Sequence, residues 1–252
     1  MRIHHLDCGN GNDAALSHAR VLVLETETRL ILIDAGFGLG DVANPARMGG
    51  YGRTSRLEFN DQHTAFRQLE ALGLDPSDVS DIILTHGDPD HAGGISDFPR
   101  ATVHLTHVEL QGVRDRPTLM ERGRYPRGQW AHSPTVIGHR PGNRTWQGFH
   151  RVRALDHLVE GLRLVQLLGH SRGHAGVAVP TGDGWLFHTG DAFLSGAALE
   201  GQRPGLGTRA MERVMAFDAV VMRATQQRLL ELQAGGQVTC LASHSPVPDT
   251  SV

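Results

Sequence analysis

Four times along this chain, a short apolar run is followed at once by histidine or aspartate. The apolar runs are DIIL, LRLVQLL, GWLF and QVTCL. The stretches that follow them in the sequence are THGDPDHAGG, GHSRGHAG, HTGDAF and ASHS. Short apolar runs bounded by glycine are typical of buried strands. One histidine after a strand is ordinary, but four such stretches predict a fold in which the ends of several strands meet at one site.

Other apolar runs define the expected elements. RVLVLE and LILIDAG, joined by TETR, predict a hairpin, and ATVHLT predicts a strand that leads into a helix from about His107. QHTAFRQLEALG has helical spacing with Gly73 as its stop, and an amphipathic helix is expected over much of 209–233. Residues 36–61, rich in Gly and Arg, are expected to form a long loop. This order of strands and helices predicts a sandwich of sheets flanked by helices.

The length of the chain suits one domain. No linker or repeat divides the 252 residues, so a single domain over 1–252 is expected. No apolar run approaches membrane-spanning length, and MRIHHLDCGN lacks a signal-peptide hydrophobic region, which favours a cytoplasmic protein. Cys8 and Cys240 form no CxxC or zinc-ribbon pattern and are expected to be buried thiols.

The basic residues exclude several functions. All 24 are arginine, because the chain contains no lysine. This excludes Schiff-base chemistry, a P-loop lysine and a lysine general base. The formal charge is −3 and no extended basic stripe is present, which argues against nucleic acid as a partner. A small-molecule substrate is therefore expected, with no membrane contact and with a homodimer left open.

Residues 114–153 are rich in arginine, and Tyr125, Trp130 and Trp146 are interleaved with the arginines. This composition suits a cap or insertion over an active site that attracts anionic or acyl substrates. It suits a solvated surface segment or a subunit contact equally well. If the segment is a cap, Tyr125 and Arg127 are the candidate substrate contacts.

The stretch THGDPDHAGG carries the densest group of candidate metal ligands. His86 ends a strand, and the turn behind it carries Asp88 and Asp90 before His91. Imidazole and carboxylate are the ligands expected for divalent zinc, manganese or iron. A solvated turn with a capped helix start would explain this stretch alone equally well. The histidines and the aspartate that follow the later strands favour the metal site.

Together these motifs resemble those of metallo-β-lactamase-fold hydrolases. That family has HxHxDH, then GH in a GHxxGH context, then a GD aspartate, then a histidine after a final strand. The match runs in order from LILIDAG to ASHS and covers most of the chain. The resemblance implies an α+β protein with an αββα sandwich of two mixed sheets flanked by helices. It also implies two divalent metal ions between the sheets, with zinc as the first expectation.

The resemblance further implies a set of metal ligands, carried over position by position. They are His86, Asp88 and His170 for a first metal, Asp90, His91 and His244 for a second, and Asp191 bridging both. Asp34, in LIDAG, and His174 match positions whose side chains support these ligands without binding the metals themselves.

Two positions depart from the family pattern. Asp88 stands where the family has histidine, and Ser245 follows the last histidine where the family often has aspartate. The family's histidine usually coordinates through Nδ1, the ring nitrogen nearer the backbone, and an aspartate oxygen has a similar reach. We therefore expect Asp88 to remain a ligand while adding negative charge and a harder donor, which opens the site to manganese or iron. Asp88→His should then restore the family's set and tighten zinc.

The resemblance implies hydrolysis of a carbonyl-centred bond in an ester, lactone, thioester or amide, by a hydroxide that bridges two metals. Asp90 is the candidate to handle the proton. Two alternatives stay open. One is a non-haem iron oxygenase similar to persulfide dioxygenases of this fold, because His86, Asp88 and His170 supply two histidines and one carboxylate. The other is a non-catalytic protein that binds a metal or ligand.

Two rival motifs overlap these residues. GHSRG, from Gly169 to Gly173, fits GxSxG, and Asp191 and His244 follow in the order of α/β-hydrolases. That motif must open a helix, whereas HAGVAVPTGDGW favours a strand and a turn. GFGLGD fails as a dinucleotide-binding motif because Asp41 stands where its third glycine is needed. The serine hypothesis also leaves THGDPDH unexplained.

Overall fold

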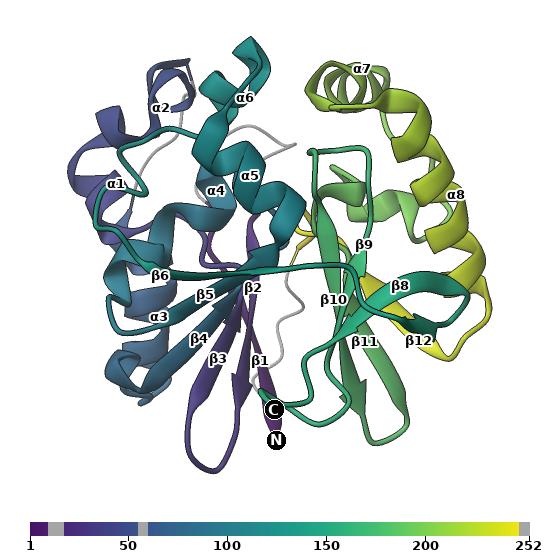
Figure 1. Cartoon of the computed structure of the whole chain (residues 1–252), viewed down its shortest axis with the longest axis horizontal. Coiled ribbons are helices and arrows are strands. Elements are labelled where there is room, and N and C mark those ends of the chain that lie inside the picture. The colour runs from purple at the N-terminus through teal and green to yellow at the C-terminus, as the bar shows by residue number, and fades with distance from the viewer. Residues whose placement is uncertain (10–17, 55–59, 247–252) are drawn as a thin grey trace.

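The computed structural model of this chain describes residues 1–9, 18–54 and 60–246. Two six-stranded sheets lie against each other, and helices cover the outer face of each sheet (Figure 1). This architecture confirms the αββα sandwich predicted from the sequence.

The first sheet takes its strands in chain order. They are β1 Arg2–Asp7, β2 Arg20–Glu25, β3 Leu30–Ile33, β4 Val79–Ile83, β5 Thr102–Thr106 and β6 Thr135–His139. β1, β2 and β3 pair antiparallel, so the expected hairpin is β2 and β3. From β3 to β6 the pairs are parallel. The carboxyl ends of β3, β4 and β5 therefore lie at one edge of the sheet.

The second sheet runs in the order β12-β11-β10-β9-β8-β7. Its strands are β7 Arg144–Trp146, β8 Phe149–Ala154, β9 Arg163–Gln166, β10 Ala175–Thr181, β11 Gly184–His188 and β12 Val238–Leu241. The pairs from β7 to β11 are antiparallel, whereas β11 and β12 are parallel. The four apolar runs that are followed in the sequence by candidate metal ligands thus lie in β4, β9, β11 and β12.

The helices are short except for one. They are α1 Leu39–Ala43, α2 Gly50–Thr54, α3 Ala65–Ala71, α4 Pro89–Ala92, α5 His107–Asp115, α6 Leu119–Arg124, α7 Leu206–Met215 and α8 Ala219–Ala234. Single 3₁₀ turns lie at Pro45–Met48, Asp61–His63, Pro76–Asp78, Gly93–Asp97, Gly190–Ala192 and Gly196–Ala198. In the described part of the chain, no helix combines the length and the apolar character needed to cross a bilayer.

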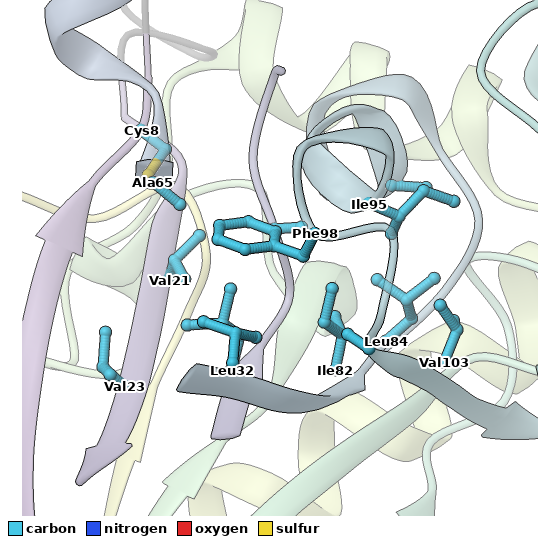
Figure 2. Packing of buried hydrophobic residues seen from close by; sticks show 14 of the residues in the cluster. Cys8, Val21, Val23, Leu32, Ala65, Ile82, Leu84, Ile95, Phe98 and Val103 are labelled. Atoms are coloured by element: carbon cyan, nitrogen blue, oxygen red, sulfur yellow. The ribbon is translucent and has the colours of Figure 1, made fainter. Parts of the chain in front are cut away.

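The apolar core has three layers because each sheet is covered on both faces. In β3, Leu30 and Leu32 pack toward the helices, whereas Ile31 and Ile33 pack between the two sheets. Alternate side chains of a strand point to opposite faces, so a strand buried on both faces needs an unbroken apolar run such as LILI. Figure 2 shows part of the helix-side layer, where Phe98 lies among the side chains of the first sheet. A third layer packs α8 against the second sheet through Leu229.

Backbone hydrogen bonds join the two sheets at the edge where these strands end. The Ala175 N–H, at the start of β10, donates to the Thr85 carbonyl behind β4 at 2.9 Å. The Arg20 N–H of β2 donates to the Ser243 carbonyl behind β12, also at 2.9 Å. The loops that follow strands of both sheets are therefore held together at one edge.

Two expected elements differ from the structure. Residues 36–61 are not one long loop, because they hold α1, a 3₁₀ turn and α2, with 55–59 outside the described residues. Buried Asp41 organises this segment by accepting hydrogen bonds from the Gly38 N–H and from the distant Gln129. The helix expected over 209–233 is interrupted between α7 and α8, because the Asp218 carboxylate caps the start of α8.

The segment 114–153 contributes strands to both sheets, and its expected role as a cap over the active site stays a prediction. It supplies β6 to the first sheet, and β7 and most of β8 to the second. β6 is an edge strand with two exposed and no fully buried residues, so its sequence lacks the apolar run that marks the inner strands. Tyr125, 1% exposed, and Trp146, 8% exposed, are buried. Cys8 and Cys240 are buried and free, as expected.

The layer between the sheets yields a stability prediction. Ile31→Ala removes a fully buried side chain from this layer and should lower the free energy of unfolding by about 2–5 kcal/mol. Leu119→Ala is the control, because Leu119 is 82% exposed, and it should change that free energy by less than about 0.5 kcal/mol. Urea unfolding of the metal-free protein measures both values. Equal effects of the two substitutions would contradict this description of the core.

Candidate metal centre

The side chains expected to bind metal lie together at the carboxyl ends of β4, β9, β11 and β12. All of them are buried. They form three overlapping triads, in each of which the possible donor atoms lie within 4.8 Å of one another. The triads are His86, Asp88 and His170; Asp90, His91 and His244; and His86, His91 and Asp191. The first two are the sets that the family resemblance assigned to the two metals.

The triad of His86, Asp88 and His170 is drawn together by one oxygen of Asp88. Asp88 Oδ2 lies 3.4 Å from His86 Nε2 and 3.2 Å from His170 Nε2. The aspartate thus points at the two histidines from the position where the family has a third histidine. Its reach is sufficient for a ligand.

The triad of Asp90, His91 and His244 has similar spacing. Asp90 Oδ2 lies 3.7 Å from His91 Nε2 and 3.6 Å from His244 Nε2. Asp90 and His91 both lie in α4, a single turn that Asp88 precedes and Pro89 begins. The Asp-Pro-Asp-His sequence therefore directs Asp88 and Asp90 into different triads.

Asp191 lies between the two triads. Its Oδ2 is 3.2 Å from His244 Nε2, 3.6 Å from His170 Nε2 and 3.8 Å from His86 Nε2. Its Oδ1 is 3.2 Å from His91 Nε2. One carboxylate therefore contacts histidines of both triads, which is the geometry that a bridging ligand needs.

Asp34 fixes the orientation of two of the histidines. It follows β3 directly and takes a left-handed backbone conformation with φ of 60°. Its Oδ2 accepts a hydrogen bond from His91 Nδ1 at 2.9 Å and one from the Thr85 hydroxyl at 2.9 Å. That hydroxyl in turn accepts a bond from His86 Nδ1 at 2.9 Å. Because Nδ1 of each histidine is held by a hydrogen bond, both histidines present Nε2 to the centre. A metal-binding histidine ordinarily has its other ring nitrogen hydrogen-bonded in this way.

His174 holds the bridging carboxylate in place without facing the centre itself. Its Nδ1 donates to the Leu167 carbonyl at 2.8 Å, and its Nε2 accepts from the Asp191 N–H at 2.9 Å. Burial holds the pKa of His174 well below its usual value, so the ring is neutral and Nε2 is free to accept. These two hydrogen bonds support the prediction that His174 holds a ligand without binding metal itself.

Sequence reasoning missed Glu109, a fully buried carboxylate in α5. Its Oε1 accepts hydrogen bonds from the Gly87 N–H at 3.0 Å and from the Tyr125 hydroxyl at 2.8 Å. Its Oε2 accepts from the Ser171 hydroxyl at 2.7 Å and from the Gly173 N–H at 2.8 Å. Glu109 thus ties together the two loops that carry the first triad. Nothing in the local sequence THVEL distinguishes it from an ordinary helical glutamate.

The two candidate substrate contacts lie in different surroundings. Tyr125 is 1% exposed and donates its hydroxyl to Glu109, so here it braces the loops. Arg127 is exposed. Arg124, which no local sequence signal distinguishes from its neighbours, is the arginine that reaches the centre. Its Nε lies 3.2 Å from Asp88 Oδ1.

The charges at the centre fit divalent metal. Burial alone would raise the pKa of Asp191, but His244 and His91 outweigh it and hold that pKa well below its usual value. Burial alone would lower the pKa of His244, but Asp191 and Asp90 raise it to about 9. His91 shows the same direction, because Asp191, Asp90 and Asp34 outweigh burial and raise its pKa well above the usual value. The carboxylates thus attract positive charge into a buried site.

Unpaired atoms support the same conclusion. Among the described residues, His86 Nε2, His91 Nε2 and Asp191 Oδ1 are buried and have no hydrogen-bond partner. Buried polar atoms are ordinarily paired, so a group of unpaired ones that face each other needs an explanation. Imidazole nitrogen and carboxylate oxygen are the donors that zinc and related divalent ions take. The residues present therefore fit a metal centre.

Comparison with known proteins agrees with this geometry. Proteins named "Probable metallo-hydrolase" from Mycobacterium tuberculosis and Mycobacterium bovis are each 44% identical to this chain over 236 residues. The match covers 92% of this chain and 76% of each relative. An "N-acyl homoserine lactonase" of Bacillus thuringiensis is 24% identical, over 83% of this chain and 74% of that protein.

Solved structures share the fold. The structure of an N-acyl homoserine lactone hydrolase with the product N-hexanoyl-L-homoserine bound at its catalytic metal centre superposes with a TM-score of 0.68 at 21% identity. It covers 96% of this chain and 92% of that one. A probable metal-dependent hydrolase from Staphylococcus aureus gives a TM-score of 0.71 at 17% identity, covering 97% of this chain and 89% of that one.

The family described as the metallo-beta-lactamase superfamily matches residues 16–221 of this chain. This match and the names of the mycobacterial relatives confirm the expectation of a metal-dependent hydrolase. The chain belongs to the metallo-beta-lactamase superfamily.

Proposed function

We propose that this chain is a two-metal hydrolase that cleaves a carbonyl-centred bond in a small molecule, with lactones and esters as the first substrates to test. The observation that carries the proposal is Asp191, whose carboxylate contacts histidines of both triads. Two-metal hydrolytic sites hold their ions ~3.5–4 Å apart, and a shared carboxylate suits that separation.

The chain's own residues would divide the work as follows. When bound, divalent metals lower the pKa of a bound water from about 15.7 toward about 7 and polarise the carbonyl oxygen. Asp34 and Glu109 hold the ligand loops in place, so the centre is organised before substrate arrives. Asp90, 6% exposed, faces the same centre and is the carboxylate that we expect to accept the proton and return it to the leaving group.

An apolar acyl substrate is supported by the surroundings of the first triad. Phe217, 39% exposed, donates its backbone N–H to the carbonyl of His170 at 2.9 Å. The Arg172 guanidinium lies 4.8 Å from the Phe217 ring centroid. An apolar ring beside a cation suits a substrate with an apolar chain and a polar or anionic head. The lactonase relatives support lactones within this class.

A substrate panel tests this function. Purified protein loaded with zinc, manganese or iron would be assayed with lactones, aryl esters, thioesters and amides. Turnover of at least one carbonyl substrate, abolished by a dipicolinate-type chelator and restored by metal, is the expected result. Failure of a fully metal-loaded protein to turn over any member would contradict the proposal and favour a metal- or ligand-binding protein.

A second candidate function is iron-dependent oxygenation, and one observation favours it. His86, Asp88 and His170 form a group of two histidines and one carboxylate, which is the ligand set of non-haem iron oxygenases. The hydrolase is preferred because the second triad and Asp191 adjoin this group. Consumption of oxygen by the iron-loaded protein with a persulfide substrate, without hydrolysis of any carbonyl substrate, would favour the oxygenase instead.

Removal of Asp88 should remove one metal and leave the other. Asp88→Ala takes a donor from the first triad only, so the protein should bind one metal per chain where the parent binds two. Asp183→Ala is the control, because Asp183 is an exposed aspartate in the turn between β10 and β11. Elemental analysis after dialysis measures the ratio. If Asp88→Ala holds as much metal as the parent, Asp88 is not a ligand.

Ser171 should be dispensable for hydrolysis. Its hydroxyl donates to Glu109 at 2.7 Å, and a strand rather than a helix follows it, so it lacks the setting of a serine nucleophile. Ser171→Ala should keep kcat within ~10-fold of the parent, whereas loss of a true serine nucleophile costs ~10⁶-fold. Steady-state kinetics check this. An inactive Ser171→Ala protein beside an active metal-stripped parent would overturn the metal mechanism.

A further inference from the structure

Arg124, the last residue of α6, extends its side chain into the first triad. The side chain is 7% exposed, and its Nε lies 3.2 Å from Asp88 Oδ1. Its Nη1 donates to the His170 carbonyl and its Nη2 to the Met215 carbonyl, both at 2.6 Å. One guanidinium therefore contacts a ligand side chain, the backbone of a second ligand and the end of α7.

This arrangement sets Arg124 apart from nearby arginines of the same segment. Arg114, Arg122 and Arg127 are exposed. A buried guanidinium is unfavourable unless a negative charge and hydrogen-bond acceptors surround it. Arg124 has both, because Asp88 supplies the charge and two carbonyls supply the acceptors.

The two oxygens of Asp88 have different partners. Oδ2 lies beside His86 and His170, whereas Oδ1 lies beside Arg124. The contact at Oδ1 is an ion pair that lacks hydrogen-bond geometry, whereas Oδ2 is the oxygen beside the two histidines. Asp88 also brings a negative charge to a position where the family has a neutral imidazole, and the guanidinium brings an equal and opposite charge beside it.

We propose that Arg124 is the charge partner and positioning residue of Asp88. The pair gives the first metal site the net charge of an imidazole ligand and limits Asp88 to one donor oxygen. This inference rests on the proposed two-metal function. It assigns to Arg124 a role in metal affinity, acting through Asp88, and no contact with substrate.

If Arg124 is the charge partner of Asp88, the substitution Asp88→His should weaken zinc binding rather than tighten it. From the sequence alone, this substitution restores the family's ligand set and should tighten zinc. With Arg124 in place, it instead leaves a buried guanidinium without its carboxylate beside a divalent ion. Repulsion between these positive charges should weaken zinc at the first site. Removal of the guanidinium in the same protein should restore the binding.

The experiment compares zinc binding by five proteins: the parent, Asp88→His, and Asp88→His combined with Arg124→Gln, Arg124→Lys or Arg122→Gln. Zinc per chain and zinc affinity are measured by competition with a chromophoric chelator. We expect Asp88→His to bind the weaker of its two zinc ions ~10–100-fold less tightly than the parent, which is typical for the loss of a supporting partner. Adding Arg124→Gln should recover most of that loss.

The other two double variants separate charge from shape. Arg124→Lys retains the positive charge, so it should not rescue Asp88→His. Arg122→Gln removes an exposed arginine of the same helix, so it should not rescue either. Equal rescue by Gln and Lys at position 124 would reduce Arg124 to a structural contact and overturn the proposal. So would an Asp88→His protein that binds zinc as tightly as the double variant with Arg124→Gln.

Two controls keep these outcomes distinct. Thermal unfolding of each metal-free protein shows whether it is folded. If the protein with Arg124→Gln does not fold, Arg124→Met replaces it, because methionine retains the apolar stem without the charge. Arg124→Met is expected to restore zinc binding to Asp88→His in the same way. Failure to restore it would overturn the proposal. A parent that binds fewer than two zinc ions contradicts the proposed function, and the inference fails with it. If the parent binds two zinc ions but the zinc affinities of the variants do not differ as described, the result contradicts the inference about Arg124 and leaves the proposed function intact.

Discussion

Negative charge buried at the ends of the strands is the constraint on which this site depends. Asp34, Asp88, Asp90 and Asp191 are all buried, and ionised carboxylates in such a place must face positive charge or hydrogen-bond donors. The fold satisfies them with histidines from both sheets and one guanidinium. The four apolar runs supply strands whose ends meet at one edge. The sandwich therefore brings the charged side chains together, and the loops that follow the strands set their orientation.

Much of the fold, and the grouping of most candidate site residues, could be predicted because their signals are local. LILI predicts a strand buried on both faces, and β3 contributes to two apolar layers. The stretches that follow β4, β9, β11 and β12 each contain their candidate ligands within a few residues of the strand. The family motifs then assign these candidate ligands to two metals, and the structure brings all seven candidates into overlapping triads.

What sequence reasoning missed depends on contacts between distant residues. Glu109 meets Ser171 across 62 positions, and its own helix gives no sign of this. Arg124 meets His170 across 46 positions, within a segment whose many arginines conceal the buried one. Asp41 meets Gln129 across 88 positions, which turns an expected loop into short helices. The sequence does not predict β6 as a strand, because an edge strand needs no continuous apolar run.

The most direct measurement is an anomalous-scattering map from a crystal of the zinc-loaded protein. We expect two peaks ~3.5–4 Å apart with Asp191 between them. One peak should lie about 2.0–2.2 Å from donors of His86, Asp88 and His170, and the other at the same distance from donors of Asp90, His91 and His244. A single peak, or two peaks of which neither touches Asp191, would contradict this expectation.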